Sequence, residues 1–387
     1  MRIPPARCRG TVSIRCLARL CAVVLFATSA CSIGASTGRE PPPPGSAQLR
    51  LSEYQKQDWQ VEDGLPENNV RMIAQRPDGS LLLATGSGLA TFDGQRFRSL
   101  PIEKGQIQNE AVNAVLYGRA NDLWIGTDGR GVLHQTAQGL VNVSEQAGRY
   151  NERIRMFYTD SAGVLWIATQ NGVERFANGQ LEVIAGTGMI SGDITTPFAE
   201  DGSGGMFFVT STGLYHWRDG VAERYPLQTD RADLPVAVYR DPQQRLWVGT
   251  MSHIFQLIVV PVESQGNNRA PNFAQIIRAN VKNPVTVLLG DAKGNLWIGT
   301  RHRGLWRLSS GELSHWGTQE GLADESIRSM FFDDEQNLWI GMLDGGLSRW
   351  REGPLAPFGE PEGLHATYAA NAIAGSASRI ATFHCGE

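Results

Sequence analysis

Three arginines hold the same place in three copies of an internal repeat. Arg71, Arg155 and Arg328 each follow a β-branched residue at the start of a mostly apolar run. The planar guanidinium of arginine donates paired hydrogen bonds that match a carboxylate or another oxyanion. If the repeats surround a channel, these side chains would suit an anionic or sugar ligand. In the alternative interpretation they bind neighbouring carboxylates such as Glu152 and Glu325, or are simply solvated.

The other residue types that often do chemistry are not arranged for catalysis. The seven histidines have no metal-ligand spacing, and the sequence contains no P-loop and no G-x-G-x-x-G. Its G-x-S-x-G covers residues 34–38, before the repeats begin. Four aspartates precede the second strand of their repeats, where an Asx turn is the expected role: Asp78, Asp160, Asp291 and Asp333. We therefore expect no catalytic residue, no metal site and no cofactor.

The repeat has a period of about 40 residues, which is typical of a repeat architecture. Its most regular part, LWIGT, occurs at 123–127 and 296–300, with variants at 81–85, 165–169, 206–210, 246–250 and 338–342. The mixture of apolar, aromatic and β-branched residues predicts a strand that is buried on both faces. Five of the ten tryptophans occupy its second position. Its fourth position is mostly small, which lets a neighbouring sheet approach closely.

Each repeat can be divided into four short strands. In the sixth unit we expect strands at 284–289, 296–300, 305–308 and 312–316, separated by turns. The predicted fold is all-β, a seven-bladed β-propeller of four-stranded antiparallel blades over residues 51–360. Residues 55–61 resemble a fourth strand that would pair into blade seven and close the ring. A longer step between units five and six indicates an insertion at 259–274, which we expect to be a protruding loop.

The two ends of the chain predict further segments. Residues 1–31 carry five arginines, no acidic residue and an apolar run, which indicates a disordered secretory leader. The sequence before Cys31 resembles a lipoprotein cleavage box, so Cys31 is a lipidation candidate. Ordinary cleavage nearby and an uncleaved anchor are the alternatives. Residues 32–50 form a proline-rich linker, and residues 361–387 begin an incomplete eighth repeat. All three alternatives for the leader predict a periplasmic location.

Composition narrows the possible partners. Without the five leader arginines, 30 basic residues face 39 acidic ones, which argues against binding of nucleic acid. Four of the five cysteines lie in the leader and the fifth is Cys385, so the repeats contain no disulfide framework and no thiolate metal site.

The repeat resembles a known family. The segment GLPENNV at 64–70, followed by PDG at 77–79, LLLAT at 81–85 and FDG at 92–94, looks like the two-component regulator propeller repeat. Later units are similar to its core, D-x-x-G-x-L-W-I-G-T-x-x-G-L. The resemblance covers residues 51 to about 360. It implies a periplasmic sensor of bacterial signalling proteins, in which the propeller precedes a membrane span and a histidine kinase or diguanylate cyclase.

The sequence shows no signature of such an output domain. The resemblance therefore implies an input module for a small molecule or oligosaccharide, with a membrane-embedded signalling partner or missing downstream domains. A periplasmic lyase or hydrolase and a stand-alone protein-binding lipoprotein are the alternatives.

Loops at one mouth of the channel are the expected ligand site. In a four-stranded meander, the loop between strands two and three lies on the same face as the connection to the next blade. The ligand-binding candidates on that face are Asn68, Arg71, Asp128, Arg130, Arg155, His253, Arg301, His302, Arg303, Arg328 and Asp344.

Overall fold

The five-residue motif forms a strand in every repeat, and all five residues of each copy are buried. This confirms the prediction of strands buried on both faces. The strands are β3 (Leu81–Thr85), β7 (Leu123–Thr127), β11 (Leu165–Thr169), β15 (Met206–Thr210), β19 (Leu246–Thr250), β23 (Leu296–Thr300) and β27 (Leu338–Met342). The computed structural model describes residues 54–100, 110–118, 122–150, 152–184, 197–230, 232–260 and 272–353.

Each of these strands is the second in a four-stranded antiparallel sheet. The first strands, in blades one to seven, are β2 (Val70–Gln75), β6 (Val112–Tyr117), β10 (Ile154–Thr159), β14 (Phe198–Glu200), β18 (Pro235–Arg240), β22 (Val285–Gly290) and β26 (Ile327–Phe332). The third strands are β4 (Gly88–Phe92), β8 (Val132–Thr136), β12 (Gly172–Ala177), β16 (Gly213–Arg218), β20 (His253–Val260), β24 (Leu305–Ser309) and β28 (Leu347–Glu352). The fourth strands are β5 (Phe97–Ser99), β9 (Gly139–Asn142), β13 (Gln180–Ile184), β17 (Val221–Tyr225), β21 (Asn272–Asn280), β25 (Glu312–Trp316) and β1 (Tyr54–Trp59).

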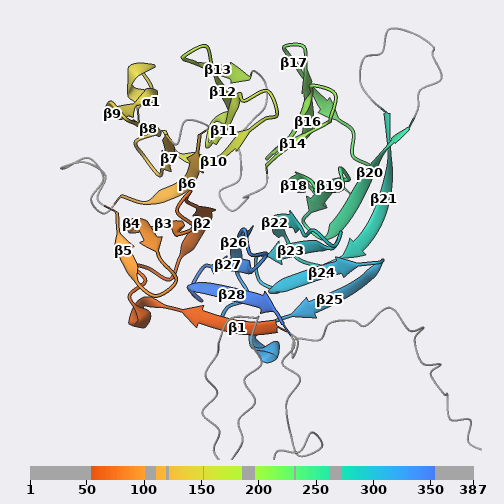
Figure 1. Ribbon diagram of the computed structural model, residues 1–387. Coiled ribbons are helices and arrows are strands. Elements are labelled where there is room, and N and C mark those ends of the chain that lie inside the picture. Colours follow the sequence, from red (N-terminus) through yellow and green to blue (C-terminus); the bar gives the residue numbers. More distant parts are fainter. Residues whose placement is uncertain are drawn as a thin grey trace, which may run out of the picture. The chain divides into compact units, whose positions relative to one another are not determined.

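Seven such sheets confirm the seven-bladed β-propeller (Figure 1). In the part of the chain that the structure describes, helix is confined to α1 (Val143–Gln146) and the 3-10 turns η2 (Val61–Asp63) and η3 (Thr318–Glu320). The four strands predicted in the sixth unit match the observed ones to within one residue.

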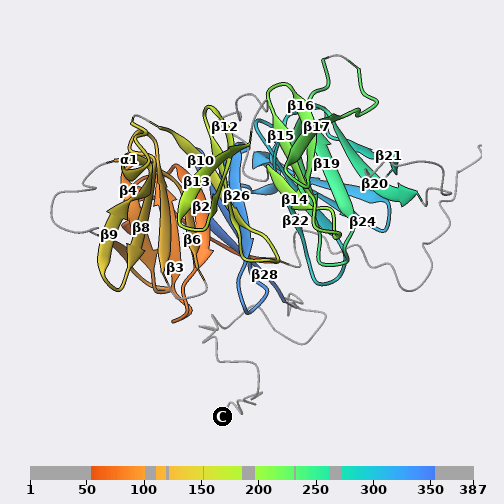
Figure 2. The same cartoon turned by 90° about the horizontal axis from the view of Figure 1, so that it is seen from above.

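The first strands surround the centre of the ring (Figures 1 and 2). Contacts run from β10 through β6, β2, β26, β22 and β18 to β14. Between blades three and four, the rings of Tyr158 and Phe198 lie 6.1 Å apart, and those of Trp166 and Phe198 lie 6.2 Å apart. The first strands therefore line a central channel.

Glycine at the fourth motif position lets adjacent blades approach closely, as predicted. A Cβ on Gly126 would lie 2.5 Å from Cγ2 of Ile154, which starts the first strand of the next blade. The same relation joins Gly249 to Val285 at 2.8 Å. Because real Cβ atoms are not found this close to other heavy atoms, a larger residue would push the blades apart.

The N-terminal strand closes the ring. Strand β1 pairs antiparallel with β28, and the sheet order is β1-β28-β27-β26. Trp59 stacks on Trp339 of blade seven at 5.5 Å and contacts Phe92 of blade one edge-on at 4.9 Å. The prediction that residues 55–61 supply the outer strand of blade seven is confirmed, with β1 ending at Trp59 and η2 beginning at Val61.

The prediction for the insertion between units five and six was wrong at both of its ends. Residues 259–274 were expected to form a loop, but Val259 pairs with Phe273 and Val260 with Asn272. Strands β20 and β21 therefore extend into the insertion as a hairpin, because their apolar and β-branched residues continue the strand pattern. Residues 261–271 lie outside the described residues.

Other predictions for the ends of the chain are not tested. The leader with Cys31, the linker at 32–50 and the incomplete repeat at 361–387 lie outside the described residues. Within the described ranges, no helix has the length and apolar character needed to cross a membrane.

Candidate functional site

A β-bulge marks the second residue of most first strands. The pairing register shifts at this position in six of the seven blades. A bulge leaves one residue unpaired and changes the direction of its side chain. The bulged residues are Arg71, Asn113, Arg155, Val236, Thr286 and Arg328. The three arginines singled out in the sequence therefore occupy equivalent places at one end of the channel.

A chain of polar contacts starts at Arg71 and crosses three blades. Nη1 of Arg71 donates to Oδ1 of Asn113 at 2.6 Å. Nδ2 of Asn113 donates to Oδ1 of Asp128 at 3.0 Å and to the carbonyl oxygen of Ile154 at 2.8 Å. Oδ1 of Asp128 also forms an ion pair with Nε of Arg153 at 2.9 Å. The contacts fix the guanidinium of Arg71 at the channel mouth.

The charges around Arg71 are mixed. Burial lowers the pKa of Arg71, while the carboxylates of Asp128 and Glu67 raise it. The positive charges of Arg328 and Arg153 lower it further. The positive charges of Arg71 and Arg328 therefore repel each other at the mouth.

Buried polar atoms without a hydrogen-bond partner gather beside this arginine. They are Oε2 of Glu67, Oδ1 of Asn69 and Nε of Arg71. Glu67, Asn69 and Arg71 are every second residue of the segment that enters blade one. A buried polar atom left without a partner costs about 1–3 kcal/mol. Such a cluster is unusual and calls for an explanation such as a bound ligand or water.

Several predicted residues have structural roles at the mouth. Oδ1 of Asn68 accepts from the backbone N–H of Val61 at 2.9 Å, and its carbonyl oxygen accepts from Gly346 at 3.1 Å. Glu325, the equivalent residue in the seventh unit, accepts from the backbone N–H of Thr318 at 3.3 Å. Asn68 thus ties the closing strand to blade one.

Two other predicted residues contact the segment that enters the first strand of their own blade. Nε of Arg130 lies 3.7 Å from Oε2 of Glu110. Nδ1 of His253 lies 2.7 Å from Oδ2 of Asp233.

Arg301, Arg303 and Asp344 each form a hydrogen bond through a main-chain atom. The N–H of Arg301 donates to Pro284, the carbonyl oxygen of Arg303 accepts from Trp306, and the N–H of Asp344 donates to Asp324. The N–H of His302 donates to Asn283. The structure thus joins Arg71 to Asp128 through Asn113 and places Arg71 within the electrostatic influence of Arg328.

Sequence reasoning missed four members of the mouth: Glu67, Asn69, Asn113 and Arg153. Asn113 could have been found, because it holds in the second unit the place that Arg71 holds in the first. Glu152, one of the carboxylates expected to bind these arginines, contacts another residue. Its Oε2 accepts a hydrogen bond from the hydroxyl of Ser144 at 2.9 Å.

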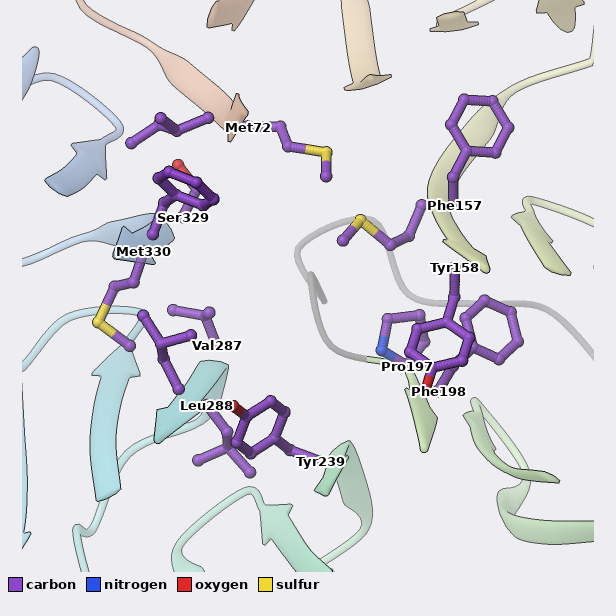
Figure 3. A pocket seen from close by; sticks show the side chains of 14 residues that line it. Met72, Phe157, Tyr158, Pro197, Phe198, Tyr239, Val287, Leu288, Ser329 and Met330 are labelled. Carbon is purple, nitrogen blue, oxygen red and sulfur yellow. The ribbon is translucent and has the colours of Figure 1, made fainter. Parts of the chain in front are cut away.

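Below the mouth, the channel is lined by apolar side chains (Figure 3). The space between them measures about 760 Å³, part of which is open solvent. Its walls come from β2, β10, β14, β18, β22 and β26, together with Pro197. The half-buried side chains that border it stand at the third and fifth positions of their strands: Met72, Met156, Tyr158, Tyr239, Leu289 and Phe331.

Hydroxyl groups of the channel tyrosines contact neighbouring blades. The hydroxyl of Tyr158 donates to Oε1 of Glu200 at 3.1 Å, and that of Tyr239 accepts from the N–H of Gly290 at 3.1 Å. Burial raises the pKa of both tyrosines. Both rings are therefore fixed at their polar ends.

Together these features define a seven-bladed β-propeller with a charged mouth above an apolar channel. Among the described residues, no group of histidine, cysteine, aspartate and glutamate side chains could hold a metal ion. The family model for the two component regulator propeller matches residues 281–302, which contain β22 and β23. The matched residues lie in the sixth repeat, whose motif resembles that of the same family in the sequence.

Solved structures share the fold. The extracellular domain of a protein described as a hybrid two component system of B. thetaiotaomicron is 22% identical, with a TM-score of 0.62 over 78% of this chain and 42% of that one. The extracellular domain of a one component system from the same organism is 20% identical, with a TM-score of 0.59 over 79% and 41%. This chain thus spans about two fifths of the length of these domains.

Virginiamycin B lyase from Staphylococcus aureus is 12% identical, with a TM-score of 0.56 over 77% of this chain and 99% of the lyase. At these identities the likeness establishes the fold alone. No curated protein is significantly similar to the chain in sequence.

Proposed function

We propose that the propeller is an extracytoplasmic input module of a bacterial signalling protein, and that it binds an anionic small molecule or saccharide at the channel mouth. The observation that carries the proposal is the cluster of buried polar atoms around Arg71. An oxyanion that accepts from Nε of Arg71 would satisfy the donor of this cluster and reduce the repulsion between Arg71 and Arg328. Oε2 of Glu67 and Oδ1 of Asn69 are acceptors, so they call for a donor such as a hydroxyl group of the same ligand.

Two further observations support this function. The mouth is preorganised, since Asn113 holds Arg71 before any ligand arrives. Preorganisation lowers the entropic cost of binding. The extracellular domains of two component and one component systems, which share the fold, are named for their place in signalling proteins. Arg155 lies at the equivalent bulge of blade three and would extend the positive surface around the ligand.

Thermal unfolding of the full chain in the presence of acidic monosaccharides, oligosaccharides, dicarboxylates and amino acids tests the proposal. A ligand that binds only the native state stabilises it by about 2.7 kcal/mol at a hundredfold excess over Kd. We expect one class of anion to raise the unfolding midpoint, and Arg71→Ala and Arg155→Ala to abolish the shift.

Arg96→Ala is the matched control, because Arg96 is exposed in a turn after β4 at the opposite end of its blade. This variant should keep the full shift. A shift that survives both arginine substitutions at the mouth would contradict the proposed site.

A lyase is the second candidate function, and the His253–Asp233 pair favours it. A histidine whose Nδ1 faces a carboxylate is held in the orientation that general acid–base catalysts use. If the protein is a lyase, His253→Gln should abolish turnover of a bound substrate and leave its binding unchanged. If the protein is an input module, a bound ligand should be recovered chemically unaltered.

A further inference from the structure

We infer that the ligand is an amphipathic acid, whose anionic group binds at the arginine mouth and whose flat apolar body enters the channel. The inference rests on the proposed function, because it names the ligand class of the same site. It is carried by the position of the apolar channel directly beneath the bulged arginines.

The two surfaces are continuous along the same strands. Arg71 is the second residue of β2, and Met72, the third, already borders the channel. In blade three Arg155 is likewise followed by Met156. A strand rises about 3.3 Å per residue, so the fifth position lies about 10 Å below the arginines. That depth fits one or two fused rings attached to an acidic group.

The channel walls offer little to a polyol. The hydroxyls of Tyr158 and Tyr239 already contact Glu200 and Gly290. The hydroxyl of Ser329 donates to the carbonyl oxygen of Val70 at 3.3 Å. Sugar hydroxyls that entered the channel would lose their hydrogen bonds to water without equivalent replacements from these groups, which is unfavourable. An apolar body loses no hydrogen bonds and gains from leaving water.

The walls combine rigid and adaptable side chains. Tyr158 and Tyr239 present ring faces that are fixed by their hydroxyl contacts (Figure 3). Met72 and Met156 are unbranched and can change rotamer to fit a ligand of irregular shape. Aromatic faces and a thioether favour a flat aromatic or alicyclic body over a bulky branched one.

Isothermal titration of the full chain with three probes tests the inference. Naphthalene-2-carboxylate carries both features, naphthalene-2-carboxamide lacks the charge, and glucuronate carries the charge on a polar body. We expect naphthalene-2-carboxylate to bind at least tenfold more tightly than either of the others.

Two variants separate the contributions of charge and channel. Arg71→Ala should weaken binding of the carboxylate at least tenfold and leave the carboxamide unchanged. Met156→Gln keeps the length of the side chain but makes the wall polar, and it should weaken both naphthalene probes at least tenfold. Ile277→Gln is the control, since Ile277 is 62% exposed on the outer strand β21 and does not border the channel.

Leu289→Gln, on the wall from blade six, provides the same measurement if Met156→Gln does not fold.

If glucuronate binds as tightly as naphthalene-2-carboxylate and depends on Arg71 but not on Met156, the amphipathic ligand is excluded while the proposed function stands. If naphthalene-2-carboxylate binds independently of Arg71, both the acidic ligand and the arginine mouth are excluded. Absence of binding by the carboxylate also overturns the inference.

Discussion

Oδ2 of Asp333 accepts the indole N–H of Trp339 at 2.7 Å, and both side chains are more than nine-tenths buried. The same carboxylate accepts the backbone N–H of Asn337 at 2.8 Å, so one residue holds both the turn and the tryptophan of the motif. Three other blades repeat the relation, in the pairs Asp160–Trp166, Asp241–Trp247 and Asp291–Trp297. The aspartate of the turn thus holds the motif tryptophan in each of these blades, and Asp241 and Asp333 are themselves buried.

Asp333→Asn should destabilise the propeller. An asparagine oxygen can accept only part of the hydrogen bonds made by the carboxylate, and the loss of one buried partner costs about 1–3 kcal/mol. Urea denaturation measures the loss. Asp93→Asn is the control, because Asp93 forms an Asx turn in an exposed position. Equal losses in the two variants would show that the indole contact has no separate effect.

Gly126→Ala should be destabilising by about 1–3 kcal/mol, because the added methyl group would overlap Ile154 in the next blade. Gly129→Ala, in the following loop, is the matched control. Its Cβ would meet no described neighbour closer than 3.8 Å, the carboxylate oxygen of Glu110. Thermal unfolding of both variants measures the difference, and a stable Gly126→Ala variant would contradict the close approach of blades two and three.

Trp59→Ala should weaken the closure of the ring. Trp59 is 7% exposed and contacts aromatic rings of blades seven and one. Removal of a buried tryptophan side chain costs roughly 3–5 kcal/mol. Tyr150→Ala, at a position that is 70% exposed, should have a much smaller effect on the urea midpoint. Similar midpoints for the two variants would mean that β1 is dispensable.

The hydrogen bonds made by Asp201 should make the stability of the folded protein depend on pH. Burial alone would raise its pKa, but hydrogen bonds from His216, from the N–H groups of Ser203 and Gly205, and from Arg218 hold the pKa well below its usual range. A carboxylate whose pKa is depressed by folding stabilises the protein above its unfolded pKa of about 3.9. That contribution is lost as the pH falls below this value.

The free energy of unfolding should therefore differ between the wild type and Asp201→Asn by a constant amount above pH about 5, and the difference should shrink as the pH falls from about 4 towards 2. Urea denaturation at a series of pH values measures it. A difference that does not change with pH would show that the hydrogen bonds do not depend on the charge of Asp201.

The sequence alone predicts the fold well, because the LWIGT motif fixes the second strand and turn residues mark the others. Tryptophan at one place in five of the seven units, and glycine two residues later in four of them, also predict how blades pack. The insertion is harder, since Gly266 and Asn267 suggest a loop while Val259 and Val260 continue a strand. Composition alone cannot show where the strand ends and the loop begins.

The candidate site is only partly predictable. Arg71 and Arg328 share a place in the repeat, so their convergence follows from the fold. The apolar channel does not, because Met72 and Tyr158 are indistinguishable in sequence from core residues of an inner strand. A bulge at the second residue shifts the alternation of side chains, so a simple period of two does not identify those that border the channel.

The pairing of Tyr54 with Glu352 at the end of the β1–β28 ladder has a mechanical consequence. The chain enters the propeller at Tyr54 and leaves it just after Glu352, so both flanking segments depart from adjacent antiparallel strands. A pulling force between them would load the ladder from this end and unzip it one residue pair at a time, rather than shear all its hydrogen bonds together. Blade seven is therefore the point at which tension would first open the ring.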